Sequence, residues 1–171
     1  MLMPNQPVPA LDLPLTIGAR YDLEKQNPKH FTMLVFYRGK HCPICRSYLE
    51  DLAGMLDDFT AAGVNVAAVS MDNEERAMVA HNEWNTGDVP LVYDLPEDQA
   101  RAWGLFISEG REDSEEPGVF SEPGLFLITP EGTLYYTSVQ NAPFARPALS
   151  EMLEGIAFIT DKDYPVRGTL T

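Results

Sequence analysis

The chain has 171 residues, of which 26 are Asp or Glu and 12 are Lys or Arg, so its formal net charge at pH 7 is −14. This acidic balance argues against a nucleic-acid partner, because phosphates would be repelled rather than bound. No stretch approaches the ~20 apolar residues of a membrane span, and the first residues lack the basic start and apolar run of a signal peptide. We therefore expect a cytoplasmic protein without a membrane partner, with residues 1–171 in a single domain that ends in a polar tail over residues 161–171.

Apolar runs typical of buried strands alternate with amphipathic stretches typical of helices. Residues 31–37, FTMLVFY, predict the first buried strand. Apolar residues at helical spacing from Ile44 to Phe59 then predict a helix that begins at Pro43 and is stopped by Gly63. The next elements are expected as a strand over 64–71, a helix capped by Asp72 or Asn73 that ends near Trp84, a strand over 90–94 and a short helix from Pro96 to Gly104.

The acidic, turn-rich segment 108–123 predicts an exposed loop, with the alternative that it lies near the chemistry and selects a partner. Two apolar runs around a Pro-Glu-Gly turn predict a hairpin over 124–139, and a last amphipathic helix carries Leu149 and Ile156 on its apolar face. This order of elements predicts an α/β fold of three layers, in which parallel strands joined by right-handed crossovers and closed by an antiparallel hairpin lie between helices.

The two cysteines, Cys42 and Cys45, lie in the sequence CPIC where the first strand gives way to the first helix. Pro43 suits the first helical position, which makes Cys42 the cap residue and places Cys45 in the first turn. Both sulfurs then lie near unpaired backbone N–H groups and the positive end of the helix dipole. Such settings lower a thiol pKa from ~8.5 into the range ~3.5 to 7.5.

Basic side chains surround the pair. Half of all the Lys and Arg residues lie between positions 20 and 46, and Arg38, Lys40, His41 and Arg46 flank the cysteines. We expect these four side chains to add to the preference for the thiolate. A thiolate with a second thiol one helical turn away is a two-electron redox device, because the second sulfur resolves the mixed disulfide or sulfenic acid that the first one forms.

Two other interpretations of the cysteines compete with the redox couple. A zinc site needs about four ligands, whereas the pair provides two and only His30, His41 and His81 offer nitrogen. Inert core cysteines are the second alternative, although burial does not explain the proline and the flanking cations. We therefore expect no metal and no cofactor.

Four stretches, LVFYRGKHCPICRSYLEDL, VAAVSMD, PLVYDLPEDQARAWGL and EPGLFLITPEGTLYY, together resemble the peroxiredoxin-like branch of the thioredoxin superfamily, the alkyl hydroperoxide reductase and thiol-specific antioxidant (AhpC/TSA) group. The resemblance extends from about residue 11 to about residue 159. It implies a thioredoxin-like three-layer α/β/α fold with a central mixed sheet, a thiol reductant that is a protein or a small molecule, and a tendency to form homodimers.

The resemblance gives the two cysteines opposite roles in two patterns. In the peroxiredoxin pattern Pro-x-x-x-Thr-x-x-Cys, Cys45 falls on the peroxidatic cysteine, Cys42 on the threonine and Arg38 on the proline. In the thioredoxin pattern Cys42 is the exposed nucleophile and Cys45 resolves. The first choice is a thiol-disulfide oxidoreductase that cycles the pair between dithiol and disulfide. The alternatives are a thiol peroxidase, in which Cys45 attacks a hydroperoxide and Cys42 resolves, and a non-catalytic thioredoxin-like binding domain.

Pro123 matches the family's proline that faces the cysteines, and we expect its peptide bond to be cis. The family's catalytic arginine, expected at or just before this proline, is absent, since Glu122 and Gly124 flank it. The residues expected to activate the cysteines or position a substrate are Tyr37, Arg38, Lys40, His41, Pro43, Arg46 and Pro123.

Overall fold

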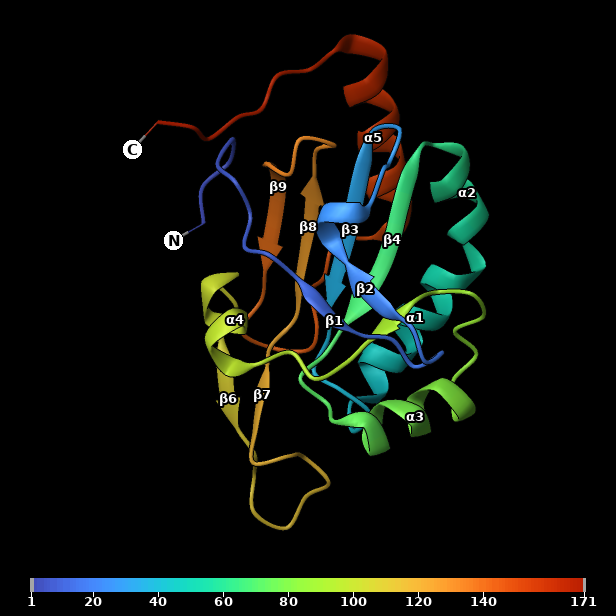
Figure 1. Ribbon diagram of the computed structural model, residues 1–171, viewed down its shortest axis with the longest axis vertical. Coiled ribbons are helices and arrows are strands. Elements are labelled where there is room, and N and C mark those ends of the chain that lie inside the picture. The colour runs from blue at the N-terminus through green and yellow to red at the C-terminus, as the bar shows by residue number, and fades with distance from the viewer. Residues whose placement is uncertain (1, 171) are drawn as a thin grey trace.

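The computed structural model describes residues 2–170 and is built on a five-stranded mixed sheet (Figure 1). The strand order is β5-β4-β3-β8-β9, with β3 parallel to β4, β4 parallel to β5, and β8 antiparallel to both β3 and β9. The strands are β3 (Phe31–Phe36), β4 (Val64–Val69), β5 (Leu91–Val92), β8 (Gly124–Ile128) and β9 (Leu134–Val139). Strand β3 lies at the centre, and every one of its residues is buried, as its unbroken apolar run predicts.

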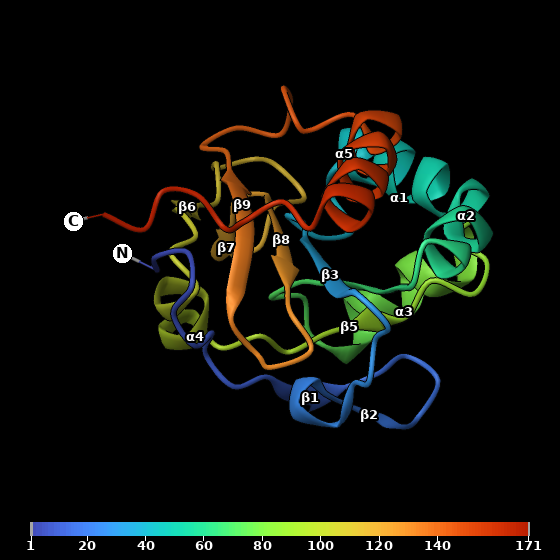
Figure 2. The ribbon, with the colours of Figure 1, turned by 90° about the horizontal axis from the view of Figure 1, so that it is seen from above.

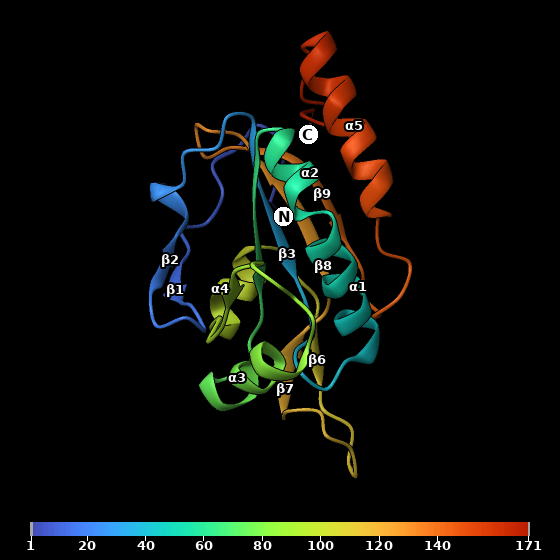
Figure 3. The ribbon, with the colours of Figure 1, turned by 90° about the vertical axis from the view of Figure 1, so that its right-hand side faces the viewer.

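Helices cover both faces of this sheet. They are α1 (Pro43–Gly54), α2 (Leu56–Ala61), α3 (Glu74–Glu83), α4 (Glu97–Ala102) and α5 (Leu149–Lys162). Helices α1, α2 and α5 lie on one face, where Leu49, Phe59 and Ile156 pack on Met33 and Val35 of β3 (Figures 2 and 3). On the opposite face, α4 and the N-terminal segment pack on the other side chains of β3. The predicted three-layer thioredoxin-like fold is therefore confirmed.

Two small hairpins were not expected from the sequence. Strands β1 (Asp12–Pro14) and β2 (Arg20–Asp22) pair near the N-terminus, after which η1 (Leu23–Lys25) forms a single 3-10 turn. Strands β6 (Ile107–Glu109) and β7 (Val119–Ser121) pair within the segment that the sequence indicated as an exposed loop. Both ends of the segment are strands, and Phe120 of β7 is buried, so the predicted loop is wrong there, whereas residues 111–115 are exposed as predicted.

Two helix boundaries also differ from the sequence-based expectation. The single helix expected from Pro43 to Gly63 is broken at Met55, which follows Gly54, a poor helix former, and leaves the helical conformation. Helix α5 continues to Lys162 and ends at Asp163, whose backbone is left-handed. Among residues 2–170, no helix is both long enough and apolar enough to cross a membrane.

Candidate redox site

The cysteine loop joins the carboxyl end of β3 to the start of α1, at the edge where parallel strands end. Helix α1 begins at Pro43, and Cys42 is its N-cap residue in an extended conformation. The Sγ atom of Cys42 accepts a hydrogen bond from the backbone N–H of Cys45 at 3.1 Å. The predicted helix start is confirmed, and with it the amide hydrogen directed at a sulfur.

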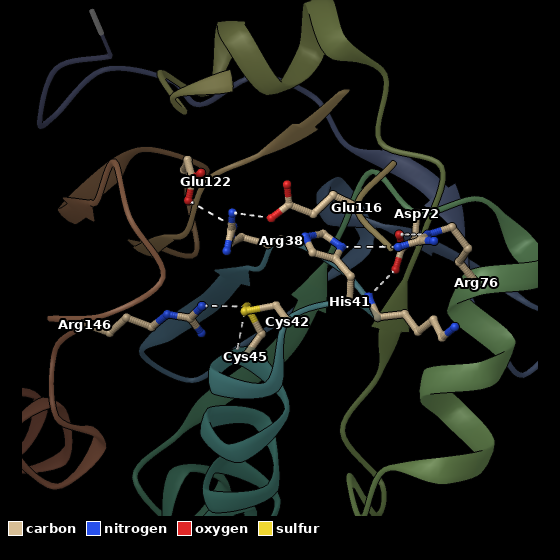
Figure 4. The surroundings of a disulfide bond; sticks show 10 residues. Arg38, His41, Cys42, Cys45, Asp72, Arg76, Glu116, Glu122 and Arg146 are labelled. Carbon is tan, nitrogen blue, oxygen red and sulfur yellow. Dashed lines mark hydrogen bonds and ion pairs between the residues drawn. A yellow bond between two sulfur atoms is a disulfide. The ribbon is translucent and has the colours of Figure 1, made fainter. Parts of the chain in front are cut away.

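Cys42 and Cys45 form a disulfide, with their Cα atoms 5.2 Å apart (Figure 4). Cys42 is 1% exposed and Cys45 is fully buried. The pair packs in the core of the α1 face with Tyr37, Leu49 and Trp84. The expectation that Cys42 would be exposed is therefore wrong for the disulfide form, because Cys42 packs within the apolar core of the α1 face. Part of the core-cysteine interpretation is correct, although polar groups reach both sulfurs.

Arg146 is the cation in contact with the redox pair. Its Nη2 donates to the Sγ of Cys45 at 2.8 Å, across 101 positions of sequence. The guanidinium lies over the ring of Tyr48 at 5.1 Å, and the hydroxyl of Tyr48 donates to the carbonyl of Pro147 at 2.8 Å. Burial lowers the pKa of Arg146 to about 10 and raises the pKa of Tyr48 to about 12. Arg146 is thus charged and Tyr48 neutral at pH 7.

The sequence-based search missed Arg146, since it looked for the family's arginine beside Pro123. One signal was present: Arg146 is the only Lys or Arg between Arg111 and Lys162. An isolated cation in so acidic a chain invites the question of which group it neutralises. In the structure, the arginine that contacts the redox pair precedes α5, whereas the family pattern placed it before β8.

Arg38 pairs with carboxylates rather than with a sulfur. Its Nη2 lies 3.3 Å from Oε1 of Glu116, its Nε lies 3.3 Å from Oε2 of Glu122, and its guanidinium lies over the ring of Phe120 at 4.6 Å. Hydrogen bonds from the backbone and side chain of Arg111 lower the pKa of Glu116 to about 2. The acidic segment therefore lies near the cysteine loop, while its selection of a partner stays a prediction from the sequence.

The other flanking cations contribute less than the sequence indicated. His41 contacts Arg76 through Nδ1 at 3.2 Å and packs against Phe120. Burial and, after it, the charge of Arg38 lower the pKa of His41 to about 4, so this side chain is neutral at pH 7 and adds no positive charge. Arg46 turns along α1 and binds Glu50 at 2.9 Å.

A contact between Lys40 and Asp72 holds the loop that precedes Cys42. The backbone N–H of Lys40 donates to Oδ2 of Asp72 at 2.6 Å, and the Nζ of Lys40 lies 4.0 Å from Oε2 of Glu115. Asp72 is 2% exposed and also accepts from Nε of Arg76 at 2.8 Å. The carboxylate therefore clamps the loop to the start of α3.

The Glu122–Pro123 bond is trans, since residues 2–170 contain no cis peptide bond. The prediction of a cis proline is wrong. Pro123 connects β7 directly to β8, and an extended connection lets the N–H of Glu122 donate to the carbonyl of Phe106 at 2.8 Å. The carbonyl of Pro123 accepts from the N–H of Gln140 at 3.0 Å. Within the same residues, no group of three or more His, Cys, Asp or Glu side chains is arranged to hold a metal ion.

Fold and site together define a thioredoxin-fold protein with a Cys-x-x-Cys disulfide at the start of its first long helix. The sequence model described as the AhpC/TSA family matches residues 4–137. The chain therefore belongs to the AhpC/TSA family, as its motifs indicated.

Individual relatives agree with this assignment. A protein of Mycobacterium tuberculosis that is assigned to the peroxiredoxins is 29% identical over 133 residues, which cover 78% of this chain and 82% of that protein. The peroxiredoxin Bcp of Xanthomonas campestris is 26% identical over 130 residues, with 74% and 78% covered. The crystal structure of Enterococcus faecalis AhpC superposes with a TM-score of 0.76 at 19% identity, covering 98% of this chain and 99% of that one. This last likeness concerns the fold.

Proposed function

We propose that the protein is a thiol peroxidase in which Cys45 attacks a hydroperoxide and Cys42 resolves the product. The contact of 2.8 Å between the Nη2 of Arg146 and the Sγ of Cys45 carries this proposal. A guanidinium in hydrogen-bond contact with a sulfur stabilises its anion, and the thiolate is the form that attacks peroxides. Membership of the AhpC/TSA family supports the peroxidase over the general thiol-disulfide oxidoreductase that the CPIC sequence first indicated.

The chemistry balances within the pair and one reductant. The Cys45 thiolate attacks the terminal hydroperoxide oxygen, the O–O bond breaks, and the alkoxide leaves as an alcohol after taking up a proton. Cys45 becomes a sulfenic acid. Cys42 then attacks the Cys45 sulfur, hydroxide leaves as water with the Cys42 proton, and the disulfide of this structure forms. Two reductant thiols, or one dithiol, return both cysteines to the reduced form.

Arg146 has spare hydrogen-bonding capacity for this reaction. Its Nε and Nη1 atoms are buried and have no hydrogen-bond partner, while Nη2 is held on Cys45. A donor that remains free beside the nucleophile can bind the peroxide oxygen on which negative charge develops. A groove of about 760 Å³ lies between α1 and residues 143–150, with Arg146 and Tyr48 in its wall. We propose this groove as the entry path of the hydroperoxide.

A second candidate function uses the sulfurs in the reverse order. The backbone N–H of Cys45 lies 3.1 Å from the Sγ of Cys42, which favours an anion on Cys42 and hence a thioredoxin-type attack on disulfides. The thiol reductant, a homodimer and a cytoplasmic location stay predictions from the sequence.

Single substitutions separate the two orders. We expect the reduced Cys42→Ser protein to consume one equivalent of hydroperoxide in a rapid single turnover and to accumulate a sulfenic acid, because Cys45 keeps its arginine. The reduced Cys45→Ser protein is expected to be inert in the same stopped-flow measurement, with sulfenic acid followed by dimedone labelling and mass spectrometry. If Cys45→Ser retains the rapid turnover, or if Cys42→Ser lacks it while still folded, the assignment of Cys45 as the peroxidatic cysteine is wrong.

A further inference from the structure

A buried ion pair lies beside the redox loop without contacting either sulfur (Figure 4). Glu122 is 4% exposed, and its Oε1 accepts from the hydroxyl of Ser108 at 2.7 Å. Its Oε2 faces the Nε of Arg38 at 3.3 Å, yet neither of these two atoms has a hydrogen-bond partner. The charges of the pair therefore compensate each other although the two facing atoms form no hydrogen bond.

The same carboxylate and the same guanidinium act on Arg146. Pro123, which follows Glu122, lies with Tyr48 and Arg146 around a narrow crevice that leaves no room for a water molecule. Burial has the largest influence on the pKa of Arg146 and lowers it. After the charge effect of Tyr48, the charge of Arg38 lowers this pKa further and the charge of Glu122 raises it. Arg146 also has two buried N–H donors without a partner. An unpaired Glu122 would therefore compete with the sulfur of Cys45 for the guanidinium of Arg146, since its charge already acts on Arg146.

We propose that Arg38 is a positioning residue of the redox site, which neutralises Glu122 and so prevents this carboxylate from drawing the guanidinium of Arg146 away from the sulfur of Cys45. The inference rests on the proposed role of Cys45 as the attacking cysteine. It assigns a purpose to two departures from the family pattern that the sequence shows together: an arginine at position 38, where the pattern has proline, and Glu122 just before Pro123, where an arginine was expected.

The surroundings of Cys45 leave few other groups for this task. The charged or titratable side chains around the disulfide are Tyr37 from β3, Arg38, Lys40 and His41 from the following loop, Tyr48 from α1, Asp72 and Arg76 at the start of α3, Glu116 and Glu122 from the β6–β7 hairpin and its exit, and Arg146. Asp72 is already paired with Arg76 at 2.8 Å. His41 is neutral at pH 7 because its pKa is about 4, and Tyr48 is neutral because its pKa is about 12. Glu116 is already paired with Arg111 at 3.2 Å. Glu122 is thus the anion whose neutralisation depends on Arg38.

The test is a double-mutant cycle in the full chain with Cys42→Ser as background, so that Cys45 is the single thiol. The cycle comprises Arg38→Gln, Glu122→Gln and the two combined, and the readout is the thiolate absorbance of Cys45 across pH. We expect Arg38→Gln to raise the midpoint by ~1 unit or more, since an opposite charge lost near an ionising group shifts its pKa by ~1 to 3 units. Adding Glu122→Gln should return the midpoint to within ~0.3 unit of the background or below it, because the competing carboxylate is gone.

Arg101→Gln is the matched control, because Arg101 forms an exposed pair with Glu97 at 2.7 Å and lies on α4. It should leave the titration unchanged. If Arg38→Gln leaves the midpoint in place, or if the double variant stays as shifted as Arg38→Gln alone, the proposal is overturned. If Arg38→Gln fails to fold, the Glu122→Gln variant decides: because Arg38 already neutralises Glu122, a midpoint that moves by ~1 unit or more from the background contradicts the neutralisation.

The titration needs no peroxide, so its outcome and that of the peroxidase assay can be distinguished. A shifted and rescued midpoint in a protein that reduces no hydroperoxide would retain the positioning role and refute the peroxidase. Rapid hydroperoxide reduction together with an unchanged midpoint would retain the peroxidase and refute the positioning role of Arg38.

Discussion

Replacing Arg146 by Met tests the contact on which the peroxidase assignment depends. The change removes the donor that lies 2.8 Å from the Sγ of Cys45 and keeps much of the side-chain volume over Tyr48. A hydrogen bond with a charged partner contributes about 1.5–3 kcal/mol. Because one pKa unit corresponds to about 1.4 kcal/mol, the pKa of the Cys45 thiol should rise by about 1–2 units in the reduced Cys42→Ser background.

The rate should fall as well. The same 1.5–3 kcal/mol, applied to the transition state, corresponds to a loss of about tenfold to a hundredfold in the second-order rate constant with hydroperoxide. Both quantities are measured on one preparation, the pKa by thiolate absorbance and the rate by stopped-flow. Arg101→Met, which removes an exposed arginine of α4, is the control and should change neither quantity.

Unfolding should not account for the loss. In the disulfide form the sulfur that Arg146 contacts is neutral, and two nitrogens of the guanidinium are buried without partners. Removing this desolvated charge leaves no unpaired anion behind, so the urea midpoint of the oxidised variant should stay close to that of the wild type. A Cys45 thiol pKa that does not move, with a rate within twofold of the background, would refute the assignment of Arg146 to the attacking sulfur.

Two further predictions concern the loop before the cysteines. Gly39 has φ +122°, and a Cβ there would lie 2.6 Å from Oδ1 of Asp72. Gly39→Ala should therefore lower the free energy of unfolding by about 1–3 kcal/mol. Gly54→Ala on α1, where the added Cβ would meet open space, should raise the free energy of unfolding by about 0.5–1 kcal/mol. Equal effects of the two substitutions in urea denaturation would contradict the clamp. The second prediction follows from the pKa of His41, which the fold lowers from 6.5 to about 4. Between these pH values the unfolded chain binds the proton and the folded chain does not, so the free energy of unfolding should fall as the pH decreases through this window, and His41→Asn should remove that part of the decrease. Parallel pH curves for wild type and variant would show that His41 ionises freely in the folded protein.

Local sequence determined the part of the site that neighbouring residues build. Cys42, Pro43 and Cys45 lie within one turn, so their types and spacing fix the cap, the helix start and the amide hydrogen directed at Cys42. The unbroken apolar run of β3 and the helical spacing after it likewise fix the strand–helix junction, because hydrophobic periodicity is a short-range property. The family resemblance extended these local elements to the correct fold.

Tertiary structure decided which charges act on the sulfurs. Arg146 reaches Cys45 from 101 positions away, while Arg38, seven positions before it, is turned toward Glu116 and Glu122. The sequence counts His41 among the basic residues, but burial lowers its pKa to about 4, so the side chain is neutral at pH 7. Charge proximity along the chain does not predict the field at an atom, because ion pairing and desolvation depend on segments that meet only when the sheet and its helices are packed together.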